Sequence, residues 1–193
     1  MNVLVLGGNG FIGKNLVKEL TNSNYNVTSF DLNLPIQRVE GVNYIQGNFF
    51  DEAMLDYLTE NINVIFHAIS SINPGNSNQK YMEGYENDLI YTIKLCRIVK
   101  NKNIKMIFLS SGGTVYGNQE VQPITEEAMT HPINHYGNLK LCIENTMRTF
   151  NCQENTKIII ARIANPYGVG QDFKKGVGFI DAVLKKGISN ETI

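Results

Sequence analysis

The chain has 193 residues, of which 42% are apolar, 18% charged and 9% aromatic. This composition is ordinary for a globular protein and excludes a disordered chain, a collagen and a disulfide-rich miniprotein. The 17 basic and 18 acidic residues give a formal net charge of -1. That balance leaves no basic excess to bind nucleic acid and no polybasic segment to bind a membrane surface.

The three cysteines, Cys96, Cys142 and Cys152, are odd in number and lack the spacing of metal ligands. We therefore expect buried, reduced thiols in a cytoplasmic protein, and no metal site. No stretch reaches the ~18 consecutive apolar residues of a membrane-spanning helix. The first residues lack the basic start and the cleavage site of a signal peptide. We therefore interpret them as a strand and not as a signal.

Short runs rich in valine and isoleucine alternate with longer helical stretches along the chain. The predicted strands are residues 3–6, 27–30, 42–45, 64–66, 106–109 and 158–160. The predicted helices are residues 11–20, 52–58, 81–99, 136–150 and 179–186. Most of the strand runs lack polar alternation, which is typical of strands buried on both faces of a parallel sheet. The pattern predicts an α/β fold, a Rossmann-type doubly wound parallel sheet with helices on both faces.

Two segments are predicted as loops, residues 70–80 after the fourth strand and residues 112–132 after the fifth. Both leave the carboxyl ends of strands. Open α/β sheets bind their ligands at that edge. We therefore expect the functional residues to lie there.

A glycine-rich turn follows the first strand, in the sequence VLVLGGNGFIG at residues 3–13. Gly7 permits a tight turn, Gly10 lets the backbone approach a pyrophosphate, and Gly13 allows close packing of helix on strand. The helix then begins with Phe11 and Ile12, and its free amides and partial positive charge favour phosphate. The pattern predicts a dinucleotide site.

An acidic residue stands at the expected distance from this turn. Asp31 ends the second predicted strand, where a carboxylate accepts hydrogen bonds from the diol of the adenosine ribose. The same carboxylate would repel a 2′-phosphate. The sequence therefore favours NAD over NADP.

Tyr136 and Lys140 form a Y-x-x-x-K pair on a predicted helix, so that both side chains share one helical face. A free tyrosine has a pKa of about 10 and is a poor base at neutral pH. A nearby ammonium and a positive nicotinamide ring favour the phenolate by attraction of opposite charges. Lysine can also hold the nicotinamide ribose. We therefore expect Tyr136 and Lys140 to be catalytic and to contact the cofactor.

Three further segments complete the pattern: MIFLSSGGTVYG at 106–117, YGNLK at 136–140 and RIANPYG at 162–168. Together with the glycine spacing G-x-x-G-x-x-G, they resemble the extended short-chain dehydrogenases. More narrowly, the chain resembles the NAD-dependent epimerase/dehydratase family, in particular nucleotide-sugar epimerases of the UDP-glucose 4-epimerase type. The resemblance covers essentially the whole chain.

The resemblance implies roles for further residues by position. An Asn replaces the family's usual Asp at position 48, where an amide can still bond adenine. The implied cofactor contacts outside the motifs already described are Asn48, Phe49, Ile69, Asn87 (or its neighbour Asp88), Ser110 and Ile163. Asn165 matches an Asn that contacts the phosphosugar of the substrate. His67 is expected to be structural, and His131 and His135 to lie in loops without a role.

Position 112 departs from the family pattern. The family normally has a catalytic Ser or Thr there, and this chain has Gly112. Either Ser111 or Thr114 then supplies the hydroxyl that bonds the reacting oxygen of the sugar, or no residue does. We favour Thr114, because strand alternation would keep it on the same side as position 112.

The resemblance implies an NAD-dependent 4-epimerase of UDP-hexoses, acting by transient oxidation at sugar C4. An NAD-binding fragment without turnover, a decarboxylase, a dehydratase and a reductase stay as alternatives. Family enzymes continue into a small C-terminal substrate domain. We accordingly expect an NAD-binding domain at residues 1–170 and the start of a truncated substrate region at 171–193. A homodimer through the helix at 136–150 and a role in polysaccharide biosynthesis are further expectations.

Overall fold

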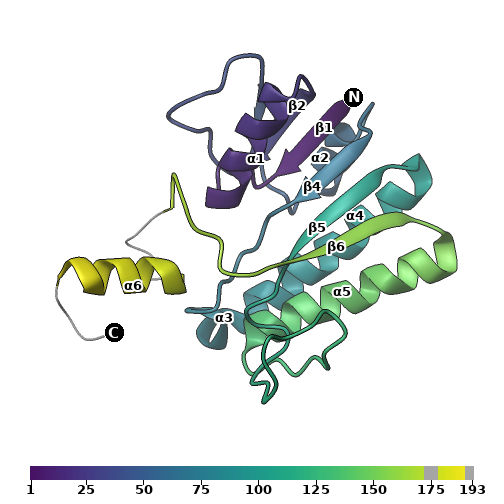
Figure 1. The fold of residues 1–193 in the computed structure, drawn as a ribbon. Helices are drawn as coiled ribbons and strands as arrows, with labels where there is room; N and C mark the ends of the chain where they lie inside the picture. Colours follow the sequence, from purple (N-terminus) through teal and green to yellow (C-terminus); the bar gives the residue numbers. More distant parts are fainter. Residues whose placement is uncertain (172–177, 190–193) are drawn as a thin grey trace.

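The computed structural model describes residues 1–171 and 178–189. Within them, six strands form one sheet in the order β3-β2-β1-β4-β5-β6, and every neighbouring pair is parallel (Figure 1). The strands are β1 (Asn2–Leu6), β2 (Asn26–Asp31), β3 (Asn43–Gln46), β4 (Val64–His67), β5 (Lys105–Ser111) and β6 (Lys157–Ile163). The chain order changes direction between β1 and β4. The predicted doubly wound parallel sheet is therefore confirmed.

Both faces of the sheet are covered by apolar packing. Leu4 and Leu6 belong to a large buried cluster that includes residues of helices α2 (Glu52–Leu58), α4 (Ile90–Lys102) and α5 (His135–Glu154). Val5, between them, packs instead in a smaller cluster with Val17 of helix α1 (Phe11–Asn22). Successive side chains of a strand point to opposite faces. The uninterrupted apolar run of β1 thus serves two cores at once.

The segment after β4 differs from its predicted structure. Helix α3 (Ser77–Glu83) begins inside the predicted loop, and a π-helical segment η1 (Gly84–Leu89) joins it to α4. Ser77 is fully buried, and the side chain of Asn73 accepts hydrogen bonds from the amides of Gly75 and Asn76 just before it. These turn-forming contacts start the helix early in a stretch whose Asn, Ser and Gly residues favour a loop. The prediction of a loop to residue 80 is wrong.

Helix α5 extends along α4, and both cover the same side of β5 and β6 (Figure 1). Asn134 caps its N-terminus by accepting a hydrogen bond from the amide of Gly137 at 2.8 Å. His135 is therefore the first residue of the helix. Our prediction that it lies in a loop is wrong. Its ring stacks on that of Tyr81, with 4.6 Å between the ring centroids.

The remaining features concern the cysteines and the C-terminal part. All three cysteines are free, but only Cys96 is buried; Cys142 is half-buried and Cys152 exposed, so the prediction of buried thiols holds for the first alone. Helix α6 (Phe179–Ile188) confirms the last predicted helix. Residues 172–177 and 190–193 of the predicted substrate region lie outside the described residues. No helix within the described residues is long and apolar enough to cross a membrane.

Candidate active site

The glycine-rich turn packs so closely that Gly7, Gly8 and Gly13 have no room for a side chain. Gly7 has φ +83, and the amides of Gly7 and Gly8 both donate to the carbonyl of Phe30, at 2.8 and 3.2 Å. A Cβ on Gly13 would lie 2.0 Å from the carbonyl oxygen of Gly7. The first turn of α1 is thereby held directly against the end of β1, as the sequence predicted.

The N-terminus of α1 can hold an anion. Its cap residue is Gly10, which has no side chain to bond the free amides of the first turn, among them those of Phe11 and Ile12. Asp31 lies at the adjacent strand end, where its Oδ2 accepts from the amide of Asn9 at 2.9 Å and its Oδ1 from that of Leu32 at 2.7 Å. Each carboxylate oxygen keeps acceptor capacity for a diol. These groups fit the pyrophosphate and the ribose of a dinucleotide.

Tyr136 and Lys140 lie in the first turns of α5. Lys140 is 3% exposed, and its Nζ donates to the carbonyl of Leu109 at 3.3 Å. The same nitrogen lies 5.5 Å from the centroid of the Tyr136 ring. Burial lowers the pKa of Lys140 to about 8, although the negative charges of Asp88 and Glu144 act in the opposite direction. The expected pair is thus present and close together, with Lys140 buried and Tyr136 half-buried.

The pKa of Tyr136 moves against our expectation. Burial and the negative charge of Asp88 raise it to about 12, so in the free chain the ammonium of Lys140 does not make the phenol a ready base. Desolvation disfavours the charged phenolate more strongly than one nearby cation favours it. Additional positive charge beside the phenol would favour its deprotonation.

Asp88, and not its neighbour Asn87, lies in this electrostatic environment. Asp88 is 3% exposed and accepts hydrogen bonds from the Ser70 hydroxyl at 2.9 Å and the Ser71 amide at 2.8 Å. Burial raises the pKa of its carboxyl despite these bonds. Asn87 is only half-buried. The sequence did not decide between Asn87 and Asp88 for this position. In the structure both lie in the π-helical segment η1, which turns the Asp88 side chain inward.

The hydroxyl of Thr114 is buried and has no hydrogen-bond partner among residues 1–171 and 178–189. Our reason for choosing it is wrong, because β5 ends at Ser111 and the amides of Thr114 and Val115 fold back onto the Ser111 carbonyl. The chain turns there and does not alternate as a strand. The carbonyl of Thr114 nevertheless lies against Gly137, since a Cβ on that glycine would be 2.5 Å from it. The backbone of Thr114 therefore lies against the residue that follows Tyr136.

Gly112 itself has little room for a side chain. Its amide donates to the carbonyl of Ile163 at 2.8 Å, and a Cβ there would lie 3.0 Å from the carbonyl oxygen of Arg162 and 3.2 Å from the Ala164 Cβ. Ile163, an expected cofactor contact, thus ends β6 beside this position. Asn165, the expected substrate contact, is exposed and has φ +44.

The other expected cofactor residues differ in which of their groups are left available to a ligand. The Ser110 hydroxyl donates to Glu144 and is committed to that contact. Phe49 is 4% exposed, and its ring lies 5.1 Å from that of His67 in the core, so only its main chain can face a ligand. Asn48 is exposed, and its side chain bonds the amide of Phe50. Ile69 is half-buried, and its amide lies against Gly7.

His67 is the structural histidine that we expected. Its ring is 2% exposed, and Nε2 shares a hydrogen bond of 2.9 Å with the hydroxyl of Thr92. Burial, together with the charge of Lys140, lowers its pKa to about 3. The imidazole is therefore neutral in the folded chain.

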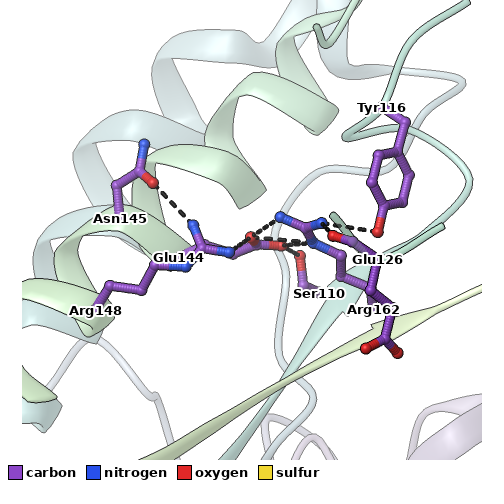
Figure 2. Close-up of polar contacts among 7 residues, drawn as sticks. All are labelled: Ser110, Tyr116, Glu126, Glu144, Asn145, Arg148 and Arg162. Carbon is purple, nitrogen blue, oxygen red and sulfur yellow. Dashed lines mark hydrogen bonds and ion pairs between the residues drawn. The ribbon is translucent and has the colours of Figure 1, made fainter. Parts of the chain in front are cut away.

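The sequence did not predict the ionic network around the buried side chain of Glu144 (Figure 2). Glu144 has a fully buried side chain and accepts hydrogen bonds from Ser110, Arg148 and Arg162. A sequence signal existed, because Tyr136, Lys140, Glu144 and Arg148 follow one another at intervals of four residues. Such spacing places all four on one face of the helix.

The glycine turn, Asp31 and the turn after β5 all lie at the carboxyl ends of parallel strands, and thus at one edge of the sheet. A dinucleotide bound along that edge can extend from Asp31 past α1 toward Tyr136. The site combines an anion-binding helix end, a diol acceptor, a phenol with a buried amine, and an unpaired hydroxyl. These groups suit proton transfer to or from an alcohol at a redox centre.

Comparison with known proteins agrees with this chemistry. The model of the NAD dependent epimerase/dehydratase family matches residues 3–192. The chain is 29% identical to a putative UDP-glucose 4-epimerase of Methanocaldococcus jannaschii, over 98% of this chain and 64% of that protein. It is 31% identical to a UDP-glucose 4-epimerase of Bacillus subtilis, over 87% of this chain and 53% of that protein.

A solved structure shows the same similarity in three dimensions. The UDP-glucose 4-epimerase of Thermotoga maritima, crystallised with UDP-glucose, matches with a TM-score of 0.87 and 28% identity. The match covers 100% of this chain and 65% of the Thermotoga chain. This chain therefore spans roughly half to two thirds of the length of these relatives.

Proposed function

This chain belongs to the NAD dependent epimerase/dehydratase family, and from that membership we propose that it is an NAD-dependent nucleotide-sugar 4-epimerase acting on UDP-hexoses. One observation carries the proposal. The half-buried Tyr136, the buried Lys140 and the unpaired Thr114 hydroxyl share a sheet edge with the glycine turn and Asp31. The relatives named UDP-glucose 4-epimerase support the choice of reaction and of substrate class.

The residues at the sheet edge would hold NAD by its polar groups. The amides that follow Gly10 would bond the pyrophosphate, and Asp31 would accept from the adenosine ribose diol. Lys140 would donate to the nicotinamide ribose. When bound, NAD supplies a reversible hydride acceptor for a carbinol carbon.

The chain's own side chains would move the proton. Tyr136 would take the proton from the 4-hydroxyl of the sugar and later return it to the same oxygen. Burial and the charge of Asp88 raise the pKa of the phenol to about 12, and positive charge beside it would favour the phenolate that this step needs. Thr114 would donate a hydrogen bond to that oxygen, in place of the hydroxyl that Gly112 lacks.

The proposal extends to domain organisation and assembly. We assign the NAD-binding domain to residues 1–170 and the start of the substrate-binding region to residues 171–193. Asn165, the expected contact of the phosphosugar, lies shortly before that region. Helix α5 would also pair with α5 of a second copy, as in the homodimer that the family resemblance implies. The exposed parts of Arg148 and Cys152 lie on this helix.

Two measurements test the proposal. NAD binding is measured by calorimetry, and conversion of UDP-galactose to UDP-glucose is followed with a coupled dehydrogenase. The wild-type chain should bind NAD and produce UDP-glucose. A Tyr136→Phe variant should bind NAD within about threefold of the wild-type affinity and lose at least about 100-fold in turnover, the usual range for a general acid–base.

The outcomes separate the alternatives. NAD binding without turnover would contradict the epimerase assignment and support a binding role alone. Failure to bind NAD would contradict the proposed site as a whole. Equal turnover in wild type and Tyr136→Phe would refute the role of the phenol.

A further inference from the structure

Glu144 is a buried carboxylate that does not belong to the proposed reaction chemistry. Its side chain is fully buried, and its two oxygens accept from Ser110 on β5, Arg162 on β6 and Arg148 on α5 itself. Burial alone would raise the pKa of this carboxyl, but the bonds from Arg162 and Ser110 and the charges of both arginines lower it. Glu144 is therefore ionised and joins α5 to two strands.

Arg162 extends this contact to the loop after β5. One edge of its guanidinium donates to Glu144, with Nε at 3.1 Å and Nη2 at 2.8 Å (Figure 2). From the other edge, Nη1 donates to the Tyr116 hydroxyl at 2.7 Å and to the carbonyl of Glu126 at 3.3 Å. The guanidinium also lies over the Tyr116 ring, 4.7 Å from its centroid. One arginine thus fixes two points of the 112–132 loop.

Tyr116 is close in sequence to the hydroxyl that the reaction needs. It is 7% exposed and comes two residues after Thr114, whose carbonyl lies against Gly137 beside Tyr136. A residue at position 112, just past the end of β5, is still held by the bond of its amide to the Ile163 carbonyl of β6. Thr114 lies on the turn beyond that bond, where a contact from another element would add support.

We propose that Glu144 and Arg162 are a positioning pair, which holds the Tyr116 segment so that Thr114 stays packed against Gly137, the residue that follows Tyr136. This inference rests on the proposed function, because it assigns the hydroxyl to the substrate oxygen. Neither member of the pair reaches the reacting atoms. The planar fork of arginine is needed, since it bonds a carboxylate with one edge and two loop acceptors with the other.

Arg148 offers a matched control. It donates to the same Oε2 of Glu144 at the same 2.8 Å, but its remaining contact is with Asn145 on its own helix. Arg162→Lys and Arg148→Lys therefore each retain a positive charge near Glu144. Only the first variant loses the bonds to the 112–132 loop. Tyr116→Phe removes the first of the two loop bonds and leaves the bond to the Glu126 carbonyl and the ion pair intact.

Hydrogen–deuterium exchange of the NAD-loaded chain tests the proposal without relying on turnover. Exchange in peptides from residues 113–132 should rise by about tenfold in Arg162→Lys and in Tyr116→Phe, as expected for a lost bond at a charged group. It should stay within about twofold of wild type in Arg148→Lys. Peptides of β1, β2 and α1 should exchange as in wild type in all three variants.

Turnover supplies the second measurement. Arg162→Lys and Tyr116→Phe should lower kcat by about tenfold and change KM and the NAD dissociation constant by less than about threefold. Unchanged exchange at 113–132 in Tyr116→Phe would overturn the proposal, even if Arg162→Lys fails to fold. An equal rise over the whole sheet would also overturn it and assign the pair to global stability. A wild-type chain that binds NAD but converts no sugar would contradict the proposed function, while the exchange comparison still decides whether the pair holds the loop.

Discussion

The burial of His67 makes a quantitative prediction about acid stability. The ring is in the core, shares a hydrogen bond with Thr92 and contacts the rings of Phe49 and Phe108. Burial, assisted by the charge of Lys140, lowers its pKa from 6.5 to about 3. In the unfolded chain the imidazole titrates normally. It therefore takes up a proton on unfolding when the pH is below about 6.5.

The sign and size of the effect follow from this difference. Because the folded pKa is the lower one, His67 stabilises the fold fully above its unfolded pKa, and the contribution is lost as the pH falls toward 3. Between about pH 7 and about pH 5, proton uptake by this one residue should lower the free energy of unfolding by about 2 kcal/mol. That is a large share of the stability of a typical domain.

Urea unfolding of wild type and His67→Gln at the two pH values isolates the effect. Glutamine keeps a polar partner for Thr92 and does not titrate. The variant should be less stable at both pH values, because it loses the ring packing, but its loss between them should be smaller by about 2 kcal/mol. His131, His135 and the carboxylates are common to both proteins and cancel in the comparison. Equal losses would show that His67 already takes up a proton in the folded chain and would refute the reasoning.

Two further predictions concern the dinucleotide turn and the catalytic pair. Gly13→Ala should destabilise the fold by about 3 kcal/mol and weaken NAD binding by more than about tenfold, since its Cβ would lie 2.0 Å from the Gly7 carbonyl oxygen. Urea unfolding measures the loss of stability, and calorimetry measures the loss of NAD affinity. Gly187→Ala is the control, because nothing lies within 4 Å of its Cβ, and wild-type behaviour of Gly13→Ala would contradict the packing argument. Asp88→Asn should lower the pKa of Tyr136, because the Asp88 charge raises it, and should shift the rising limb of the pH–rate profile, where the phenol loses its proton, to lower pH. A shift to higher pH would contradict the assignment of Asp88.

Local patterns in the sequence sufficed to predict the sheet and the dinucleotide turn. The glycines at positions 7, 10 and 13 must be followed by a helix start, and Asp31 must end the next strand. These are constraints between residues close along the chain. The same holds for Tyr136 and Lys140, which are one helical turn apart. Each could be predicted because the backbone geometry of a strand, a turn or a helix sets the distances involved.

Contacts between distant segments could not be predicted in this way. The Glu144–Arg162–Tyr116 network joins a helix, an edge strand and a loop, and the inward turn of Asp88 depends on a π-helical segment. The direction of the Tyr136 pKa shift likewise depends on how deeply the phenol is buried. The sequence by itself thus determined which groups are present and their local geometry. Only the tertiary structure decided which charges are removed from water and brought together, because desolvation and pairing depend on packing between elements.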